Sequence, residues 1–186
     1  MLNNLIQIEK GILNLDIANR YFQEDVPFYC NLDVFVFKLK QGKLQKEKDL
    51  VFYNNLSDAE GTVKFLDVGD TDYDCDHRIY VNISCLPPAT DEVIIVCVPE
   101  LPSYPHSSNQ GFFQIKVTLQ ESLAREHRMK HIDMHTLDFT ISDAPLIIMQ
   151  LRKHEQNGFL LEFPNLKLSH SIEDFIKNHE PTNPKN

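Results

Sequence analysis

Five aspartates crowd into one short stretch of this sequence, LDVGDTDYDCDHR, and they are the first residues whose spacing could carry chemistry. They are Asp67, Asp70, Asp72, Asp74 and Asp76. Two like charges in contact repel by roughly 1 kcal/mol in water and by several times more at a shielded site. The stretch is therefore either a solvated acidic run or a place where a cation binds.

The alternating pattern DxDxDxD at residues 70–76 favours Ca²⁺ as that cation. Calcium takes roughly six to eight hard oxygen ligands at about 2.3–2.6 Å. A straight strand would hold alternate side chains about 6–7 Å apart, so the stretch must curl, which Gly69 permits. It is not an EF-hand, because neither DxDxD frame is followed by glycine and the twelfth position is Val81 or Ile83 rather than Glu.

Other segments must complete such a ligand set. The nearest oxygen donors along the chain are the side chains of Asn31 and Asp33 in CNLDVF and of Asn54, Asn55, Asp58 and Glu60 in YNNLSDAEG.

A second group of chemical interest is the histidine series His127, His131 and His135. On a helix, this spacing of four would align three imidazoles, which suit Zn²⁺, Cu²⁺ or Ni²⁺. HIDMH alternates as a strand, however, which would place His131, Asp133 and His135 on one face. We interpret it as a surface strand, with a transition-metal site as the weaker alternative.

Sequence motifs of common enzymes are missing. The chain contains no GxSxG, HExxH, GxGxxG or GxxxxGK[ST] pattern. The four cysteines show no CxxC pair or zinc-like spacing, so we interpret them as small buried hydrophobic residues. We expect a protein without catalytic residues.

The elements that must position the aspartates are predicted to be strands. Apolar and polar residues alternate with period two, which is typical of half-buried strands. The expected strands comprise two that reverse at Lys10-Gly11, around Ile6–Ile8 and Leu13–Ile17, and residues 34–40, 49–54, 62–66, 79–83, 92–98, 112–119, 130–139, 146–152 and 158–163. SDAEG (57–61) and HEQNG (154–158) are predicted turns, and residues 99–111 a long loop.

Because no long amphipathic helix separates these strands, we expect an all-β fold: a β-sandwich of about ten mostly antiparallel strands. One short helix is predicted near the C-terminus, capped by Ser171 with Asp174 three residues into it. No linker divides the chain, so residues 1–180 are expected to form a single domain and 181–186 a flexible tail.

The net charge and the apolar runs limit the kinds of partner that this protein could bind. A net charge of -9 gives no source for phosphate neutralisation, which argues against nucleic acid. The longest apolar runs are too short to insert into a membrane, and MLNNLIQIEKG lacks the features of a secretory signal. We expect a cytoplasmic protein.

Residues 49–98 resemble the TerD family of tellurium-resistance and stress-response proteins. A strand ending in FYNN, an acidic-Gly turn, a GD segment, an acidic stretch and a strand ending in VNI follow here in the family's order. The likeness continues more faintly through IEKGILNLDI, NLDVFVFKL and the region from Ser142 to Phe163.

The resemblance implies a β-sandwich of bacterial origin that binds one or two Ca²⁺ ions and has no catalytic activity. It also implies other Ter-type proteins as partners, including a membrane-embedded one, and a location in the cytoplasm or at the inner face of the membrane. By position it implies Asp33, Asn54, Asn55, Asp70 and Asp76 as metal ligands, whereas Asp67, Asp72 and Asp74 are added by local chemistry.

Departures from the family pattern leave an alternative open. The acidic stretch is shorter, Tyr73 and Cys75 stand where acidic ligands or glycines are expected, His77 replaces a Glu, and the chain has no Trp. The first hypothesis is a calcium-binding protein that presents a Ca-ordered acidic loop to partners. The alternative is a degenerate interaction scaffold that no longer binds metal.

Overall fold

The computed structural model describes residues 5–23, 26–28, 32–67, 77–99, 110–123, 126–140, 144–154, 158–164 and 166–181. In residues 18–23, 26–28, 67, 110–123 and 126–140 it describes the backbone alone. The predicted loop at 99–111 and the predicted tail at 181–186 lie almost entirely outside the described residues.

Strands dominate the described chain, as the period-two pattern predicts. They are β1 (Ile6–Ile8), β2 (Ile12–Gln23), β3 (Val26–Phe28), β4 (Leu32–Lys40), β5 (Lys43–Leu44), β6 (Leu50–Val51), β7 (Val63–Asp67), β8 (His77–Asn82), β9 (Glu92–Pro99), β10 (Gln110–Leu123), β11 (Glu126–Thr140), β12 (Leu146–Lys153), β13 (Phe159–Glu162) and β14 (Leu166–Lys167). The helical elements of the described chain are two 3-10 turns, η1 (Glu47–Asp49) and η3 (Ile83–Cys85), and the α-helix α1 (Ile172–His179).

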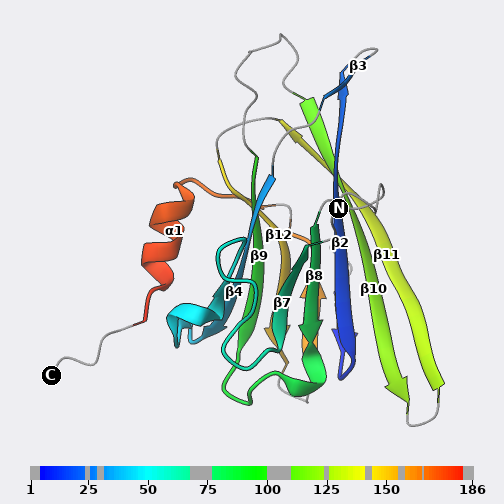
Figure 1. The fold of residues 1–186 in the computed structure, drawn as a ribbon, viewed down its shortest axis with the longest axis vertical. Coiled ribbons are helices and arrows are strands. Elements are labelled where there is room, and N and C mark those ends of the chain that lie inside the picture. The colour runs from blue at the N-terminus through cyan, green and yellow to red at the C-terminus, as the bar shows by residue number, and fades with distance from the viewer. Residues whose placement is uncertain are drawn as a thin grey trace, which may run out of the picture.

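These strands form two antiparallel sheets (Figure 1). Sheet A has the order β1-β13-β12-β9-β4-β5, with β14 paired to β12 and β6 paired to β4. Sheet B has the order β11-β10-β2-β8-β7, with β3 paired to β2. The predicted all-β sandwich with a short C-terminal helix is confirmed.

The main core lies between the two sheets. Leu13, Leu15 and Ile17 of β2 are fully buried there, and Val34 and Val36 of β4 face them from the other sheet. Burying an aliphatic side chain of this size stabilises a fold by roughly 1.5–3 kcal/mol. The alternation of buried and half-buried positions in β2 fixes its register, because a slip of one residue would turn all three side chains outward.

A second core lies on the outer side of sheet A, beneath α1 (Figure 1). Phe37 of β4 contacts Phe175 of α1 edge to face, with the ring centroids 5.0 Å apart. β4 is consequently buried on both faces, which explains why VFVFKLK is almost continuously apolar. The predicted cap is also confirmed, since Ser171 Oγ accepts a hydrogen bond from the N–H of Asp174 at 3.2 Å.

The N-terminal hairpin predicted at Gly11 is wrong, although both of its strands exist. β1 pairs with β13 in sheet A, whereas β2 pairs with β8 and β10 in sheet B. At Gly11 the chain crosses between the sheets, and the carbonyl of Gly11 accepts the N–H of Ile83 at 2.9 Å. Two apolar strands that face one core from opposite sheets show the same alternation as a hairpin.

The predicted turn at 57–61 is confirmed, and the chain also reverses at the second predicted turn, 154–158, of which residues 155–157 lie outside the described residues. Asp58 N bonds to Val63 O at 3.0 Å across the first, and Gly61 has a positive φ of 69°. At the second, β12 and β13 pair antiparallel, and Gly158 has a φ of 93°. A Cβ atom on Gly158 would lie 2.5 Å from the carbonyl oxygen of Ile8, so this turn also depends on close packing against β1.

Several predicted strands have different lengths in the structure. Residues 49–54 form only the short β6, followed by a tight turn, while β10 and β11 are longer than expected. The β10–β11 pairing shifts register between Val117 and Thr118, opposite Asp133 and His131. The histidine series therefore does not share one uninterrupted period-two frame, as its interpretation as a regular strand assumed.

The cysteines differ from one another. Cys97 is buried in β9, and burial raises the pKa of its thiol far above the ordinary value. Cys85 is exposed in η3, so the interpretation of the cysteines as buried is wrong for this residue. Cys30 and Cys75 lie outside the described residues.

Candidate functional site

The acidic segment, residues 67–76, begins at the last residue of β7. Asp67 is paired with His77, the first residue of β8. Paired residues in an antiparallel ladder have Cα atoms about 4.5–5.5 Å apart. The two ends of the segment are thus held next to each other at one end of sheet B. The side chain of Asp67 and the residues Asp70, Asp72, Asp74 and Asp76 lie outside what the structure describes.

The turn that carries Asn54 approaches the same end of the sandwich. β6 runs beside β4, with Val51 opposite Val36 and the Phe52 ring stacked on Phe35 at 5.8 Å. The chain then reverses and returns along β7, where Phe65 N donates to Leu56 O at 2.9 Å. The reversal at Tyr53 and Asn54 therefore lies between the beginning of β4 and the end of β7.

The two predicted asparagines differ in their contacts. The amide of Asn55 donates to the carbonyls of Leu50 at 2.6 Å and Lys48 at 3.2 Å, so this residue holds the turn together. Asn54 is exposed at the tip. Asp33 is half-buried near the beginning of β4. Figure 1 shows that the N-terminal end of β4 and the C-terminal end of β7 lie toward the same end of the sandwich.

Asp58 and Glu60, which the sequence also offered as donors, surround a lysine instead. Lys38 Nζ lies 2.6 Å from Asp58 Oδ2 and 2.9 Å from Asp49 Oδ1, and it also pairs with Glu60 Oε2. We call Lys38, Asp49, Asp58 and Glu60 the lysine-centred cluster. Lys38 is five positions after Asp33 in β4, which corresponds to about 17 Å along a strand.

The carboxylates of this cluster are fixed by further hydrogen bonds. Asp58 accepts from Thr62 Oγ1 at 2.6 Å and from the N–H of Val63 at 2.9 Å. Asp49 accepts from the N–H of Lys46 at 3.0 Å. The Lys46 side chain pairs with Glu60 at 2.6 Å from the solvent side. The cluster is therefore rigid, and two lysines compensate three carboxylates.

The pKa shifts of Lys38 and Glu60 make both groups poor general bases at neutral pH. Burial by itself lowers the pKa of Lys38, but the carboxylates of Asp58, Glu60 and Asp49 beside its ammonium together raise it above the ordinary value for lysine. Hydrogen bonds from Lys38 and Lys46 lower the pKa of Glu60 to about 2. Lys38 thus stays protonated and Glu60 stays ionised.

Lys38 is a site residue that the sequence pattern did not predict. A signal was present, because Lys38 has the same parity in β4 as Leu32, Val34 and Val36, which line the core between the sheets. A lysine at an inward position is rarely buried without carboxylate partners. Asp49 carried no comparable signal, because it was expected to begin a strand.

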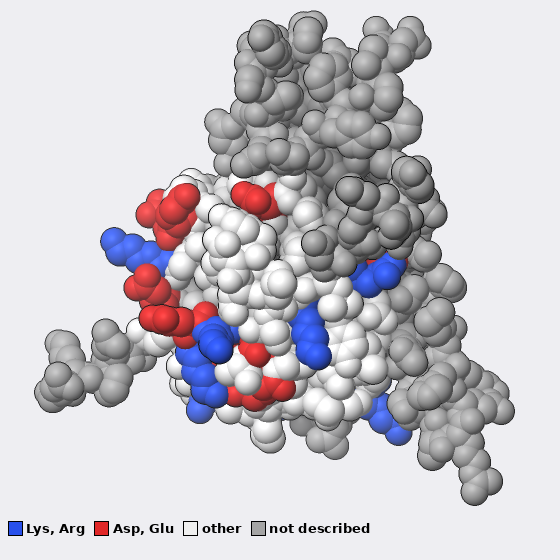
Figure 2. Space-filling view, viewed as in Figure 1, with Lys and Arg blue, Asp and Glu red and all other residues white. Residues whose placement is uncertain are grey.

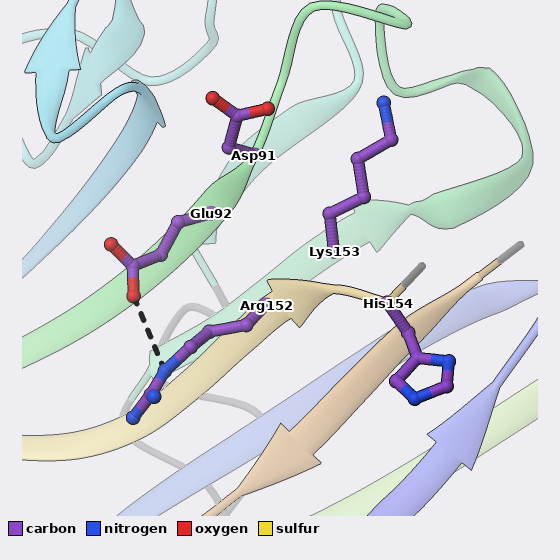
Figure 3. A pocket seen from close by; sticks show the side chains of 5 residues that line it. All are labelled: Asp91, Glu92, Arg152, Lys153 and His154. Carbon is purple, nitrogen blue, oxygen red and sulfur yellow. Dashed lines mark ion pairs between the residues drawn. The ribbon is translucent and has the colours of Figure 1, made fainter. Parts of the chain in front are cut away.

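A pocket of about 520 Å³ lies away from this cluster, at one end of β9 and β12 (Figure 3). Its lining residues are Asp91, Glu92, Arg152, Lys153 and His154. Arg152 pairs with Glu92 at 3.5 Å, and Lys153 Nζ donates to Pro88 O at 2.5 Å. The Arg152–Glu92 pair compensates two of these charges, and among the lining residues that the structure describes no nucleophile lies next to a base.

The described surface shows no single-sign patch on the face in Figure 2. Lys and Arg side chains stand beside Asp and Glu side chains at its lower left. In the described part of the chain, no helix is both long and apolar enough to cross a membrane.

The sequence matches the TerD domain over residues 9–156, which is more than half of the chain, so this protein belongs to the TerD family. No curated protein matches it. The solved structures that share its fold include the following two. A protein of unknown function, SAV2460, has 11% identity and a TM-score of 0.62, covering 91% of this chain and 96% of its own.

The second structure is a homologue of the telluride resistance protein TerD, SCO6318 from Streptomyces coelicolor A3(2). It has 12% identity and a TM-score of 0.56, and the match covers 92% of this chain and 99% of that one. At such low identity the two structures establish the fold alone.

Among the described residues, the three carboxylates of the lysine-centred cluster lie close enough together for metal binding to be considered. One oxygen each from Asp49, Asp58 and Glu60 lie within 4.8 Å of one another, a spacing that a divalent ion could span. The ammonium of Lys38, however, already lies within hydrogen-bond distance of Asp49 and Asp58. The residues present do not fit a bound metal ion at this cluster.

Proposed function

We propose that this TerD-family protein is a non-enzymatic calcium-binding protein of the tellurium-resistance type. The acidic segment would bind Ca²⁺, and the ordered segment would be presented to a partner protein. The observation that carries the proposal is the pairing of Asp67 with His77, which holds both ends of the segment together. A segment closed in this way can surround one ion more easily than an open chain of the same length.

Two features outside the segment support the proposal. Asp33 at the beginning of β4 and the turn at Asn54 lie toward the same end of the sandwich, where they could add oxygen ligands. Family membership supports the same assignment. The expected partners are other Ter-type proteins, including a membrane-embedded one, and the expected location is the cytoplasm.

A calorimetric titration of chelator-stripped protein with Ca²⁺ tests the proposal, with Mg²⁺ as the competing ion. Saturable binding of calcium at sub-millimolar concentration is expected, and Asp70→Ala should weaken it at least tenfold. The matched control is Asp174→Ala, which removes an exposed aspartate of α1. Equal binding by Asp70→Ala and Asp174→Ala would contradict the proposal.

The lysine-centred cluster favours a second candidate, a scaffold that has lost metal binding. In this cluster the chain compensates its own carboxylates with Lys38 and Lys46. Such a scaffold would attract a basic partner by its net charge of -9. Its association with that partner would be sensitive to salt and indifferent to calcium.

A further inference from the structure

Lys38 is the buried lysine of the lysine-centred cluster, whereas Lys46 is exposed. Lys38 projects from an inward position of β4, and its side chain is 5% exposed. An ammonium at such depth costs several kcal/mol unless opposite charges and hydrogen bonds compensate it. The three carboxylates around Nζ supply that compensation.

The three carboxylates come from two different segments of the chain. Asp49 ends η1, whereas Asp58 and Glu60 belong to the turn before β7. Asp58 is oriented by Thr62 and Val63 through its two oxygens. Asp49 Oδ1 makes no hydrogen bond of favourable geometry within the described structure, so the charge of Lys38 at 2.9 Å is what compensates it.

This arrangement has the form of a small cation site. The oxygens lie within 4.8 Å of one another, as ligands on opposite sides of a calcium ion at about 2.3–2.6 Å would. The position among them is taken by an ammonium instead. A second cation a few ångströms from Nζ would be repelled by several kcal/mol at this burial.

We propose that Lys38 is a built-in cation that replaces a divalent metal ion in the lysine-centred cluster. The cluster is then held together without calcium in the natural protein. Removing the ammonium while keeping the apolar stem would turn Asp49, Asp58 and Glu60 into a site for a hard divalent cation, with Ca²⁺ preferred. This inference does not depend on the proposed function, because the acidic segment shares no residue with the cluster.

The test separates the two regions by working in a loop-neutralised protein, in which all five aspartates of the acidic segment (Asp67, Asp70, Asp72, Asp74 and Asp76) are replaced by Asn. In this background the chain that retains Lys38 should show no calcium-dependent melting shift. Adding Lys38→Met should lower the melting temperature in chelator by 10 °C or more, and millimolar Ca²⁺ should restore at least half of the loss. Folding of Lys38→Met in calcium but not in chelator would support the inference equally.

The matched control is Lys46→Met, because Lys46 pairs with the same Glu60 but is 58% exposed. This variant should melt within a few degrees of its parent and should not respond to calcium. A folded Lys38→Met that is indifferent to calcium would overturn the inference.

If Lys38→Met folds neither in calcium nor in chelator, a second measurement tests the inference. Calcium is titrated calorimetrically into the loop-neutralised protein that retains Lys38. Absence of heat supports the inference, whereas binding that Asp58→Asn abolishes would overturn it. Failure of the proposed function has a different signature, namely no difference in calcium binding between the natural and the loop-neutralised proteins.

Discussion

The lysine-centred cluster and the acidic segment gather negative charge in two different ways. The cluster sets three carboxylates against Lys38 and Lys46. The acidic segment has five aspartates and no lysine, and Arg78 just after it makes a bidentate pair with Asp16 at 2.5 and 3.1 Å. One region is compensated from within the chain, and the other region is the place where we propose that a soluble ion binds.

The difference teaches that acidic content alone does not identify a metal site. Asp58 and Glu60 precede β7 and the acidic segment follows it, so both regions are neighbours in sequence. The lysine-centred cluster differs because Lys38, which comes from β4, places its ammonium among the carboxylates. The predictions that follow test whether the two regions respond independently.

The largest effect is expected from Asp58→Ala. This change removes two hydrogen bonds and leaves the Lys38 ammonium with fewer buried partners. Breaking a buried charge pair from one side costs about 3–5 kcal/mol. Urea unfolding should show this loss both with and without calcium. A loss below about 1 kcal/mol, or one that calcium reverses, would mean that the cluster is not compensated by Lys38.

Calcium itself should have the next largest effect, acting through the acidic segment. An ion that binds only the folded state stabilises it by about 2.7 kcal/mol when its concentration is a hundred times the Kd. The increase in melting temperature should be lost in Asp70→Ala and kept in Asp174→Ala. The comparison between the two regions fails if Asp70→Ala retains the full increase.

Acid should affect the cluster through Glu60. The folded-state pKa of Glu60 is about 2, below its ordinary value of 4.5. A lowered pKa means that the stabilisation is complete above about pH 4.5 and is lost as the pH falls toward 2. The raised pKa of Lys38 means that its contribution is complete below its ordinary pKa and is lost only at more alkaline pH.

Melting curves of the natural protein and Glu60→Gln between pH 6 and 2 measure this effect. The gap between the two proteins should be constant down to about pH 4.5 and should narrow below it, because protonated Glu60 no longer differs in charge from glutamine. A gap that does not narrow would show that Glu60 contributes through packing rather than charge.

The smallest effect is expected from Lys46→Ala. Lys46 pairs with Glu60 at the surface, and exposed ion pairs contribute about 0–1 kcal/mol. The loss should shrink further in high salt, which screens exposed charges. A loss as large as that of Asp58→Ala would show that the cluster depends on its outer lysine as much as on Lys38.

Much of the fold could be predicted from the sequence, because strand alternation and helix capping depend on residues that are close together in the chain. The alternation of Leu13, Leu15 and Ile17 identified a half-buried strand, and Ser171 identified the beginning of the helix. The reversal at Gly11 was interpreted wrongly because alternation reports which face of a strand is buried but not which sheet the strand joins. Only the pairings of β1 with β13 and of β2 with β8 and β10 distinguish the two cases.

The candidate site was harder to predict for a related reason. The aspartates of the acidic segment are adjacent in sequence, so their charge is visible at once. The partners of Lys38 are 11, 20 and 22 positions away along the chain and meet only after β4, β6 and β7 have assembled. Lys38 shares the alternation of Leu32, Val34 and Val36 along β4, which predicts that it points inward. The neighbouring sequence does not predict which carboxylates will contact it.

Helix α1 has a consequence for how this protein is made. It covers the outer side of β4 and β9, yet it is translated more than a hundred residues after β4. At about 5–20 residues per second, the ribosome takes several seconds or more to reach it. During that time Phe35, Phe37 and Leu39 lack the helix that covers them in the finished fold.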